Sequence, residues 1–544
     1  MTGPSVRPSC NHQLLKAMER RYPVGIQTFS EIIRNGYVYV DKTDQVWQLT
    51  RYAKYIFLSR PRRFGKSVLC STLNSYFSGD KELFEGLKIM EMEKEWKHYP
   101  VIHISLSRAK NQTTPEGLRD ALIWVMKEMI EQYGREDDEK TPGQVLWGLI
   151  SRAYKQTGMQ AVVILDEYDA PLLDVLHLDI LDEMRVVLQE FYQVLKDADP
   201  MLKFCFITGI TKFSQLSIFS TINNLTNITL DTMFGTICGI TEEELTTTLK
   251  PDIELLAAHN QMNYEQMHSK LKAQYDGYHF TELLDEEVYN PFSLIKSFLQ
   301  RKLGFYWFDS GTPSFLIRQM KHFQTNIMEV DNLEADASAF DQPTENMQNA
   351  LPLLFQSGYL TIKDYDPEVD IYTLSIPNQE VRVGYVKGLL PIYIGLEDSD
   401  VKTGFAMRFW RALKKGDIDL AMREMQTYMA GIPYVEGFKQ KLAEAATREG
   451  FYEYTMYLIF SMLNVYARTQ VKCAGGRVDM VVWMPDTVYV FELKTDGTPQ
   501  EALQQIDSHG YAFQYKTDGR RVVKVGVKFN ADNRIPENWV IKHE

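Results

Sequence analysis

The sequence predicts a multidomain α/β protein that begins with a parallel β-sheet covered by helices on both faces. Three observations support this prediction. The chain has 544 residues, more than one hydrophobic core usually organises. From about residue 22 to 240, short apolar runs of strand type alternate with longer helical stretches, which is the pattern of βαβ units. Further strand-like runs lie near the C-terminus, and mainly helical sequence separates the two regions.

The expected elements follow from these patterns. Buried strands of a parallel sheet are predicted at Tyr55–Leu58, Val101–Ser105, Ala161–Leu165 and Phe204–Thr208. A helical lid with a small winged element should follow, with short strands near residues 358–362 and 372–376. Helices are then expected at Trp410–Gly431 and Phe451–Ala467, before a hairpin of Arg477–Trp483 and Thr487–Lys494. The predicted division is a tail at 1–21, a sheet domain at 22–240, a lid at 241–400 and a C-terminal α/β domain at 401–544.

Composition narrows the class of protein. The hydrophobic share of 44% and the charged share of 24% are those of a globular protein. Five scattered cysteines without a CxxC spacing argue against a disulfide framework or a cysteine zinc site. The sequence shows neither a secretory leader nor an apolar run of transmembrane length, so we expect a cytoplasmic protein without a membrane partner. With a net charge of −13, nucleic-acid binding would depend on local basic patches or on metal ions.

A phosphate-binding loop is predicted between the first strand and the next helix. Strand, loop and helix follow one another in the order that a P-loop requires. Backbone N–H groups and the helix N-terminus attract phosphate, Lys66 adds a positive charge, and the Ser67 hydroxyl is a ligand for Mg²⁺. Arg60 stands where the general pattern has its first glycine. The expected nucleotide-binding residues are Arg60, Pro61, Arg62, Arg63, Phe64, Gly65, Lys66 and Ser67.

Two further strands are expected to bring polar groups to this loop. Ala161–Leu165 is followed by Asp166 and Glu167. We expect Asp166 to hold Mg²⁺ and Glu167 to polarise the attacking water. Thr208, at the end of another strand, is a candidate sensor near the γ-phosphate of ATP, although a core role is an equal alternative.

Carboxylates also gather in the C-terminal hairpin. The two-residue period of a strand places Glu492 and Lys494 on one face, and antiparallel pairing should bring Asp479 close to Glu492. Two adjacent carboxylates repel each other unless a cation lies between them, so Asp479 and Glu492 are candidate Mg²⁺ ligands. Lys494 would then orient or help to deprotonate a water molecule.

These motifs resemble known families. The segments RPRRFGKS (60–67), LDEYDAPL (165–172), GITKF (209–213), SIFSTINNL (217–225) and YWFDSGTPSFL (306–316) are similar to predicted AAA-ATPase-like proteins of Bacteroidetes and other anaerobic bacteria. The resemblance covers most of the chain and implies nucleotide binding, because the basic, proline-containing loop is usual in that family. The D…ExK arrangement resembles the PD-(D/E)xK nuclease superfamily. That resemblance implies a restriction-endonuclease-like fold and adds Glu453, Gln505 and Tyr511 as matching positions.

The expected function is therefore ATP binding and hydrolysis coupled to metal-dependent cleavage of DNA or RNA. The alternative is a nucleotide-switched sensor or scaffold whose C-terminal domain binds nucleic acid without cutting it. Monomer, dimer and ring-shaped homo-oligomer all stay open, because an arginine finger can act in trans.

Overall fold

The computed structural model divides the chain into two compact units, residues 1–380 and 381–544. It describes residues 20–544 except 174, 177, 213–224, 285, 310–315, 317–318, 320–322, 324–331, 344–346, 386–407, 410, 431–455, 457–459, 461–465, 474–475, 485, 518, 531–534 and 544. The regions expected at 22–240 and 241–400 thus share the first unit up to Glu380.

A parallel sheet forms the centre of the N-terminal unit. Its strands lie in the order β2-β3-β4-β1-β5, and each neighbouring pair is parallel. Their bounds are β1 Tyr55–Ser59, β2 Val101–Ser105, β3 Ala161–Asp166, β4 Leu202–Gly209 and β5 Thr226–Asn227. The first four coincide with the predicted strands. Because β1 and β3 are buried along their whole length, they are apolar up to their last residues, Ser59 and Asp166, and do not alternate.

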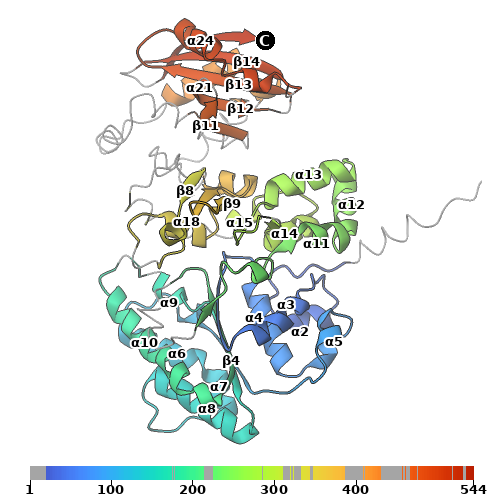
Figure 1. The fold of residues 1–544 in the computed structure, drawn as a ribbon, viewed down its shortest axis with the longest axis vertical. Helices are drawn as coiled ribbons and strands as arrows, with labels where there is room; N and C mark the ends of the chain where they lie inside the picture. Colours follow the sequence, from blue (N-terminus) through green and yellow to red (C-terminus); the bar gives the residue numbers. More distant parts are fainter. Residues whose placement is uncertain are drawn as a thin grey trace, which may run out of the picture. The chain divides into compact units, whose positions relative to one another are not determined.

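Helices cover both faces of this sheet (Figure 1). One face carries α2 Phe29–Arg34, α3 Thr43–Tyr52, α4 Lys66–Phe77 and α5 Ile89–Met92. The other carries α6 Pro115–Val125, α7 Lys127–Tyr133, α8 Pro142–Thr157 and α10 Leu181–Asp197, with the short α9 Ala170–Leu173 nearby. Local signals define α8: a capping box of Thr141 and Gln144 starts it, and Gly158, with a φ of 68°, ends it. The predicted α/β fold with helices on both faces is confirmed.

The rest of the N-terminal unit is mainly helical, as expected. A two-stranded ladder of β6 Ile240–Thr241 and β7 Val288–Tyr289 accompanies α11 Glu242–Thr247, α12 Lys250–His259, α13 Tyr264–Tyr275 and α14 Pro291–Gln300. A three-stranded sheet in the order β8-β10-β9 follows the short α15 Tyr306–Asp309. Its elements are β8 Leu333–Ala335, β9 Thr361–Asp366 and β10 Ile371–Ser375, with α17 Ala337–Phe340 and α18 Leu351–Gln356 beside it.

The C-terminal unit is built on a mixed sheet in the order β11-β12-β13-β14-β15. Its strands are β11 Tyr466–Cys473, β12 Gly476–Trp483, β13 Thr487–Lys494, β14 Arg521–Phe529 and β15 Pro536–His543, and its longer described helices are α21 Ile418–Ala430 and α24 Pro499–Ser508. The hairpin of β12 and β13 confirms the predicted strands. Of the helix expected at Phe451–Ala467, most positions lie outside the described residues, and the last two belong to β11.

Candidate nucleotide and metal sites

The phosphate-binding loop connects the end of β1 to the start of α4. Strand β1 ends at Ser59 and α4 begins at Lys66, so the loop of six residues lies at the carboxyl edge of a parallel sheet. Gly65 has a φ of 93°, a left-handed conformation that favours glycine. The first N–H groups of α4 point out of the helix and have no partner within it, which creates a site for an anion.

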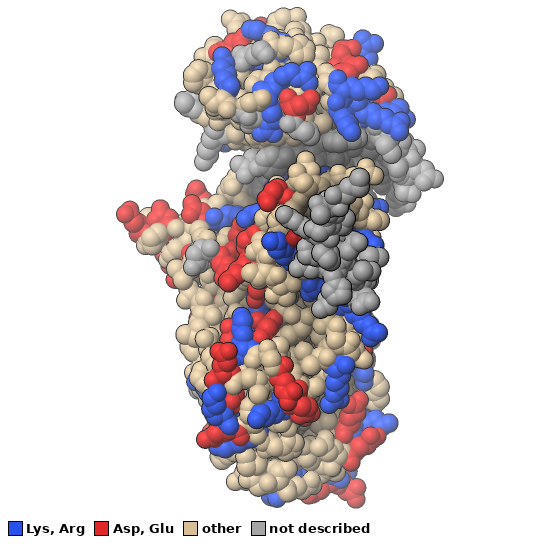
Figure 2. Space-filling model, turned by 90° about the vertical axis from the view of Figure 1, so that its right-hand side faces the viewer, with Lys and Arg blue, Asp and Glu red and all other residues tan. Residues whose placement is uncertain are grey.

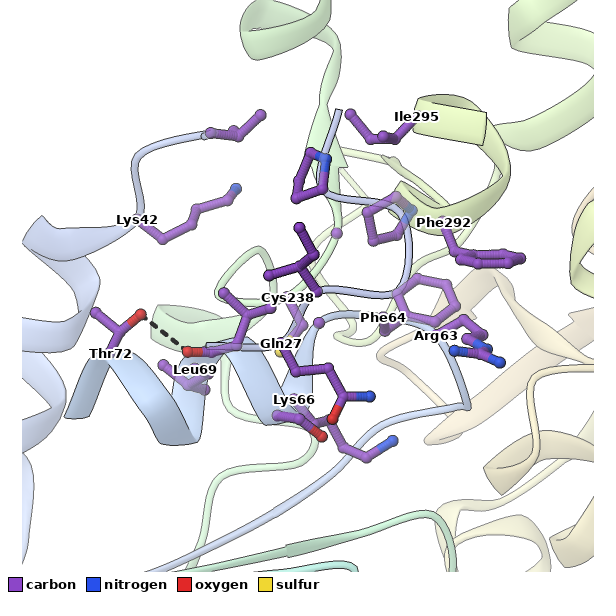
Figure 3. Close-up of a pocket in the computed structure, with 18 of the residues that line it drawn as sticks. Gln27, Lys42, Arg63, Phe64, Lys66, Leu69, Thr72, Cys238, Phe292 and Ile295 are labelled. Atoms are coloured by element: carbon purple, nitrogen blue, oxygen red, sulfur yellow. Dashed lines mark hydrogen bonds between the residues drawn. The ribbon is translucent and has the colours of Figure 1, made fainter. Parts of the chain in front are cut away.

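A cavity of about 500 Å³ opens beside this loop. One part is lined by the loop and α4, and another by apolar residues of four separate segments, 23–26, 38–40, 237–240 and 291–295. In Figure 3 the Gln27 side chain extends toward Lys66, while Phe292 and Ile295 lie at the far wall. The cavity therefore joins a cationic, phosphate-binding end to an apolar wall of the kind that receives a nucleotide base.

Lys66 and Ser67 connect the loop to the predicted acids. The Ser67 hydroxyl lies close enough to the Asp166 carboxylate, at the end of β3, to stabilise its charge. The Lys66 ammonium donates to the carbonyls of Arg60 and Pro61, at 2.8 and 2.9 Å. Burial lowers the pKa of Lys66 and raises the pKa of Asp166, whereas the Ser67 hydroxyl acts on Asp166 in the opposite direction. The structure thus brings together the three residues expected at phosphate and Mg²⁺.

Glu167 lines the same cavity but is paired with a residue that the sequence analysis did not single out. Its Oε2 lies 2.8 Å from the Lys110 ammonium, and both side chains are about one-third exposed. Glu167 has a left-handed φ of 53°, an uncommon conformation for a residue with a side chain. Lys110 follows β2, the strand beside β3. Polar residues just beyond the carboxyl ends of neighbouring parallel strands were the signal that could have revealed it.

Arg60 does not face the cavity. Its side chain is buried, and the guanidinium lies 4.3 Å from the Phe280 ring centroid. It donates to the carbonyls of Ser59 at 2.9 Å, Thr229 at 2.7 Å and Phe234 at 3.0 Å. Burial lowers the pKa of Arg60 to about 10. Like Arg60, Pro61 is absent from the cavity wall, whereas the loop residues lining it are Arg62, Arg63, Phe64, Gly65, Lys66 and Ser67.

The Thr208 side chain, like that of Arg60, does not face the cavity. It is fully buried, and its hydroxyl donates to the Leu58 carbonyl at 2.7 Å, between β4 and β1. Just beyond it, the buried Asp169 carboxylate accepts from Ile210 N–H at 3.0 Å and from both Thr211 N–H and Thr211 hydroxyl at 2.7 Å. Asp169 therefore fixes the loop that follows β4, and Thr208 belongs to the core of the sheet.

The C-terminal carboxylates are adjacent. The register of β12 and β13 pairs Met480 with Phe491, and Asp479 and Glu492 come next along the two strands. Asp479 Oδ2 accepts from the Leu493 N–H at 2.7 Å, and the Lys494 ammonium lies 3.3 Å from Glu492 Oε1. Burial first, and the charge of Asp479 second, raise the pKa of Glu492 to about 7.

The additional nuclease positions lie around this hairpin or outside the described residues. Gln505 is on α24, which packs on β13 and β14. Tyr511 is buried in the core of the unit, where its hydroxyl approaches Gly476. Glu453 falls outside the described residues. Within the described part of the chain, no group of three or more His, Cys, Asp or Glu side chains gathers as a ready metal site, so the carboxylates form a two-acid site.

Comparison with known proteins agrees with this arrangement. Residues 23–219 match the family described as predicted AAA-ATPase, and residues 447–539 match the PD-(D/E)XK nuclease superfamily. An uncharacterised protein in the vnfD 5′ region of Azotobacter chroococcum mcd 1 is 32% identical over 536 residues, which are 96% of this chain and 99% of the relative. A solved structure of the Aeropyrum pernix Orc1 protein in complex with DNA covers 71% of this chain and 94% of its own, with 9% identity and a TM-score of 0.22.

The fold and the loop define an AAA-type ATPase domain joined to a nuclease-like domain. The chain belongs to the predicted AAA-ATPase family and carries a PD-(D/E)XK nuclease superfamily domain at its C-terminus. Among the helices that the structure describes, none combines the length and the apolar character needed to cross a membrane.

Proposed function

We propose that the N-terminal unit binds ATP and hydrolyses it with Mg²⁺. The observation that carries this proposal is the cavity itself, because Lys66 and Ser67 of the phosphate-binding loop and Glu167, just beyond the acidic end of β3, line it together. Lys66 and the N–H groups of the loop would hold the phosphates, and Glu167 would orient the attacking water.

The oxygen donors at this site fit Mg²⁺. A serine hydroxyl and a buried carboxylate are hard ligands, and burial makes the Asp166 charge costly unless a cation compensates it. When bound, Mg²⁺ supplies charge neutralisation on the phosphates. Ser67 and Asp166 would hold it, and Lys66 would exchange its two backbone carbonyl acceptors for phosphate oxygens.

We further propose that the C-terminal unit cleaves nucleic-acid phosphodiesters with a divalent metal. Glu492 is 2% exposed, and its Oε2 meets no hydrogen-bond donor among the described residues, so this atom fits a metal ligand. Asp479 would supply the second carboxylate and Lys494 would orient the attacking water. When bound, the metal supplies Lewis-acid stabilisation of the phosphate. Lys and Arg side chains on the visible face of this unit (Figure 2) favour an anionic polymer, despite the net charge of −13.

The ATPase proposal is tested by nucleotide binding and turnover. Lys66→Ala should abolish ATP binding, whereas Glu167→Gln should bind ATP and hydrolyse it slowly, since only the group that orients water is changed. Lys81→Ala, an exposed lysine outside the cavity, is the matched control. Turnover that is the same in all four proteins would mean that this cavity is not the hydrolytic site.

The nuclease proposal is tested by cleavage of single- and double-stranded DNA and RNA with Mg²⁺ or Mn²⁺, with and without ATP. Wild type should cut at least one substrate, and the double variant Asp479→Ala/Glu492→Ala should not. Asp496→Ala/Glu537→Ala removes two exposed acids of the same unit and should cut normally. Binding without cleavage by wild type on every substrate would instead establish the alternative function, a nucleotide-switched sensor or scaffold.

A further inference from the structure

All five residues between Ser59 and Gly65 contact a part of the N-terminal unit that lies more than 200 positions later in the sequence. Arg60 and Phe64 contact the aromatic segment 278–280. Pro61 packs against Gly358, where an added Cβ would come within 2.6 Å of it. The remaining contacts are a cation–π pair of Arg63 with Phe292 and a hydrogen bond of Arg62 with Trp307. The loop is therefore an interface as well as a phosphate site.

Trp307 occupies a central place in this interface. Its indole N–H donates to the Arg62 carbonyl at 3.1 Å, and its ring lies 5.1 Å from that of Tyr359. The described part of helix α15 is Tyr306–Asp309, and the contacts of Trp307 with the loop and with Tyr359 hold it in position. Movement of the Arg62 carbonyl must therefore move or release Trp307.

The Arg62 carbonyl shares one planar peptide group with the N–H of Arg63. In a trans peptide these two groups point in opposite directions. Trp307 thus holds one side of the plane, and the opposite side presents an N–H from a residue that lines the cavity. Arg63 has a left-handed φ of 67°, which surrounding contacts must maintain. A phosphate that binds this N–H acts on the same peptide plane as Trp307.

A second hydrogen bond of Trp307 leads to the end of the N-terminal unit. Its backbone N–H donates to Glu380 Oε1 at 2.8 Å, and Glu380 is 1% exposed. Glu380 is the last residue of this unit and belongs to a helix whose described part is 379–385. Two hydrogen bonds of one residue thus connect the phosphate-binding loop to the last residue of the N-terminal unit.

We propose that Trp307 is a positioning residue that couples ATP binding at the loop to the helix at 379–385. The inference rests on the proposed binding of ATP. Trp307→Phe removes the indole donor and keeps an aromatic ring. It should raise the Kd for ATP about 2- to 10-fold, the effect of one net hydrogen bond, and should abolish the ATP-dependent change in amide exchange at residues 379–385.

Two other variants separate coupling from binding and from folding. Glu380→Ala should leave the Kd for ATP near that of wild type and still abolish the exchange response. Trp96→Phe is the matched control, because the Trp96 indole N–H is buried and meets no acceptor among the described residues, so both responses should persist. Failure of wild type to bind ATP would overturn the proposed function. The coupling would be overturned if wild type bound ATP without a change in amide exchange at residues 379–385. It would also be overturned if that change persisted in both Trp307→Phe and Glu380→Ala.

Discussion

Replacing Glu492 with glutamine should stabilise the metal-free C-terminal unit above neutral pH. The folded state raises the pKa of Glu492 from 4.5 to about 7, because the carboxyl is buried beside Asp479. A raised carboxyl pKa means that the folded state binds the proton more tightly than the unfolded state. The stability associated with this proton is complete below pH 4.5 and is lost as the pH rises through about 7. At about 1.4 kcal/mol per pKa unit, the loss is about 3 kcal/mol.

The assay is urea-induced unfolding of the full chain at several pH values between 4 and 8. Unfolding of the C-terminal unit is monitored through hydrogen exchange of the backbone amides of β13. Glu492→Gln should resemble wild type at the lowest pH and exceed it by about 3 kcal/mol at the highest, in the presence of a chelator. Adding Mg²⁺ at high pH should raise the free energy of unfolding of wild type and leave that of the variant unchanged, because a ligand stabilises the state that binds it. A difference that does not vary with pH would refute the reasoning, and Glu537→Gln, an exposed acid, is the control.

Substitutions at three further positions test the N-terminal unit. Arg60→Met should destabilise the protein by about 2–4 kcal/mol in thermal unfolding, since three carbonyls lose their charged donor, and should affect ATP affinity far less than Lys66→Ala. Asp169→Ala leaves two N–H groups and a hydroxyl without their acceptor, so we expect a loss of at least about 3 kcal/mol, measured in the same way. Lys110→Met leaves the Glu167 charge uncompensated beside the phosphate site and should weaken ATP binding about fivefold by titration, whereas Lys110→Arg should not.

The sequence predicted β1, β3 and β4 because each contains a short, continuous apolar run, which marks a strand buried on both faces. The pair of Asp479 and Glu492 was predictable for a different reason. A period of two and a short turn are local features, and together they fix the register of a hairpin. Such local signals carried most of the fold and the position of both candidate sites.

The residues that the sequence did not reveal depend on long-range contacts. The apolar wall of the cavity comes from four separate segments without periodicity, and only the folded chain brings them together. Arg60 looked like a phosphate ligand because it lies in a basic loop next to Lys66. Its burial depends on Phe280, whose position relative to the loop no local pattern encodes. Thr208 likewise faces the core, because its hydroxyl satisfies a neighbouring strand.

The unusual composition of the loop has a physical reason in these contacts. Glycines in a phosphate-binding loop let the backbone adopt the required shape and approach the ligand closely. Here the shape of residues 60–64 is maintained by contacts of their side chains and of the Arg62 carbonyl with later segments. A loop ordered in advance loses less conformational entropy when a nucleotide binds. We therefore expect nucleotide affinity to depend on residues such as Trp307 and Phe280, which contact the loop from later segments of the chain.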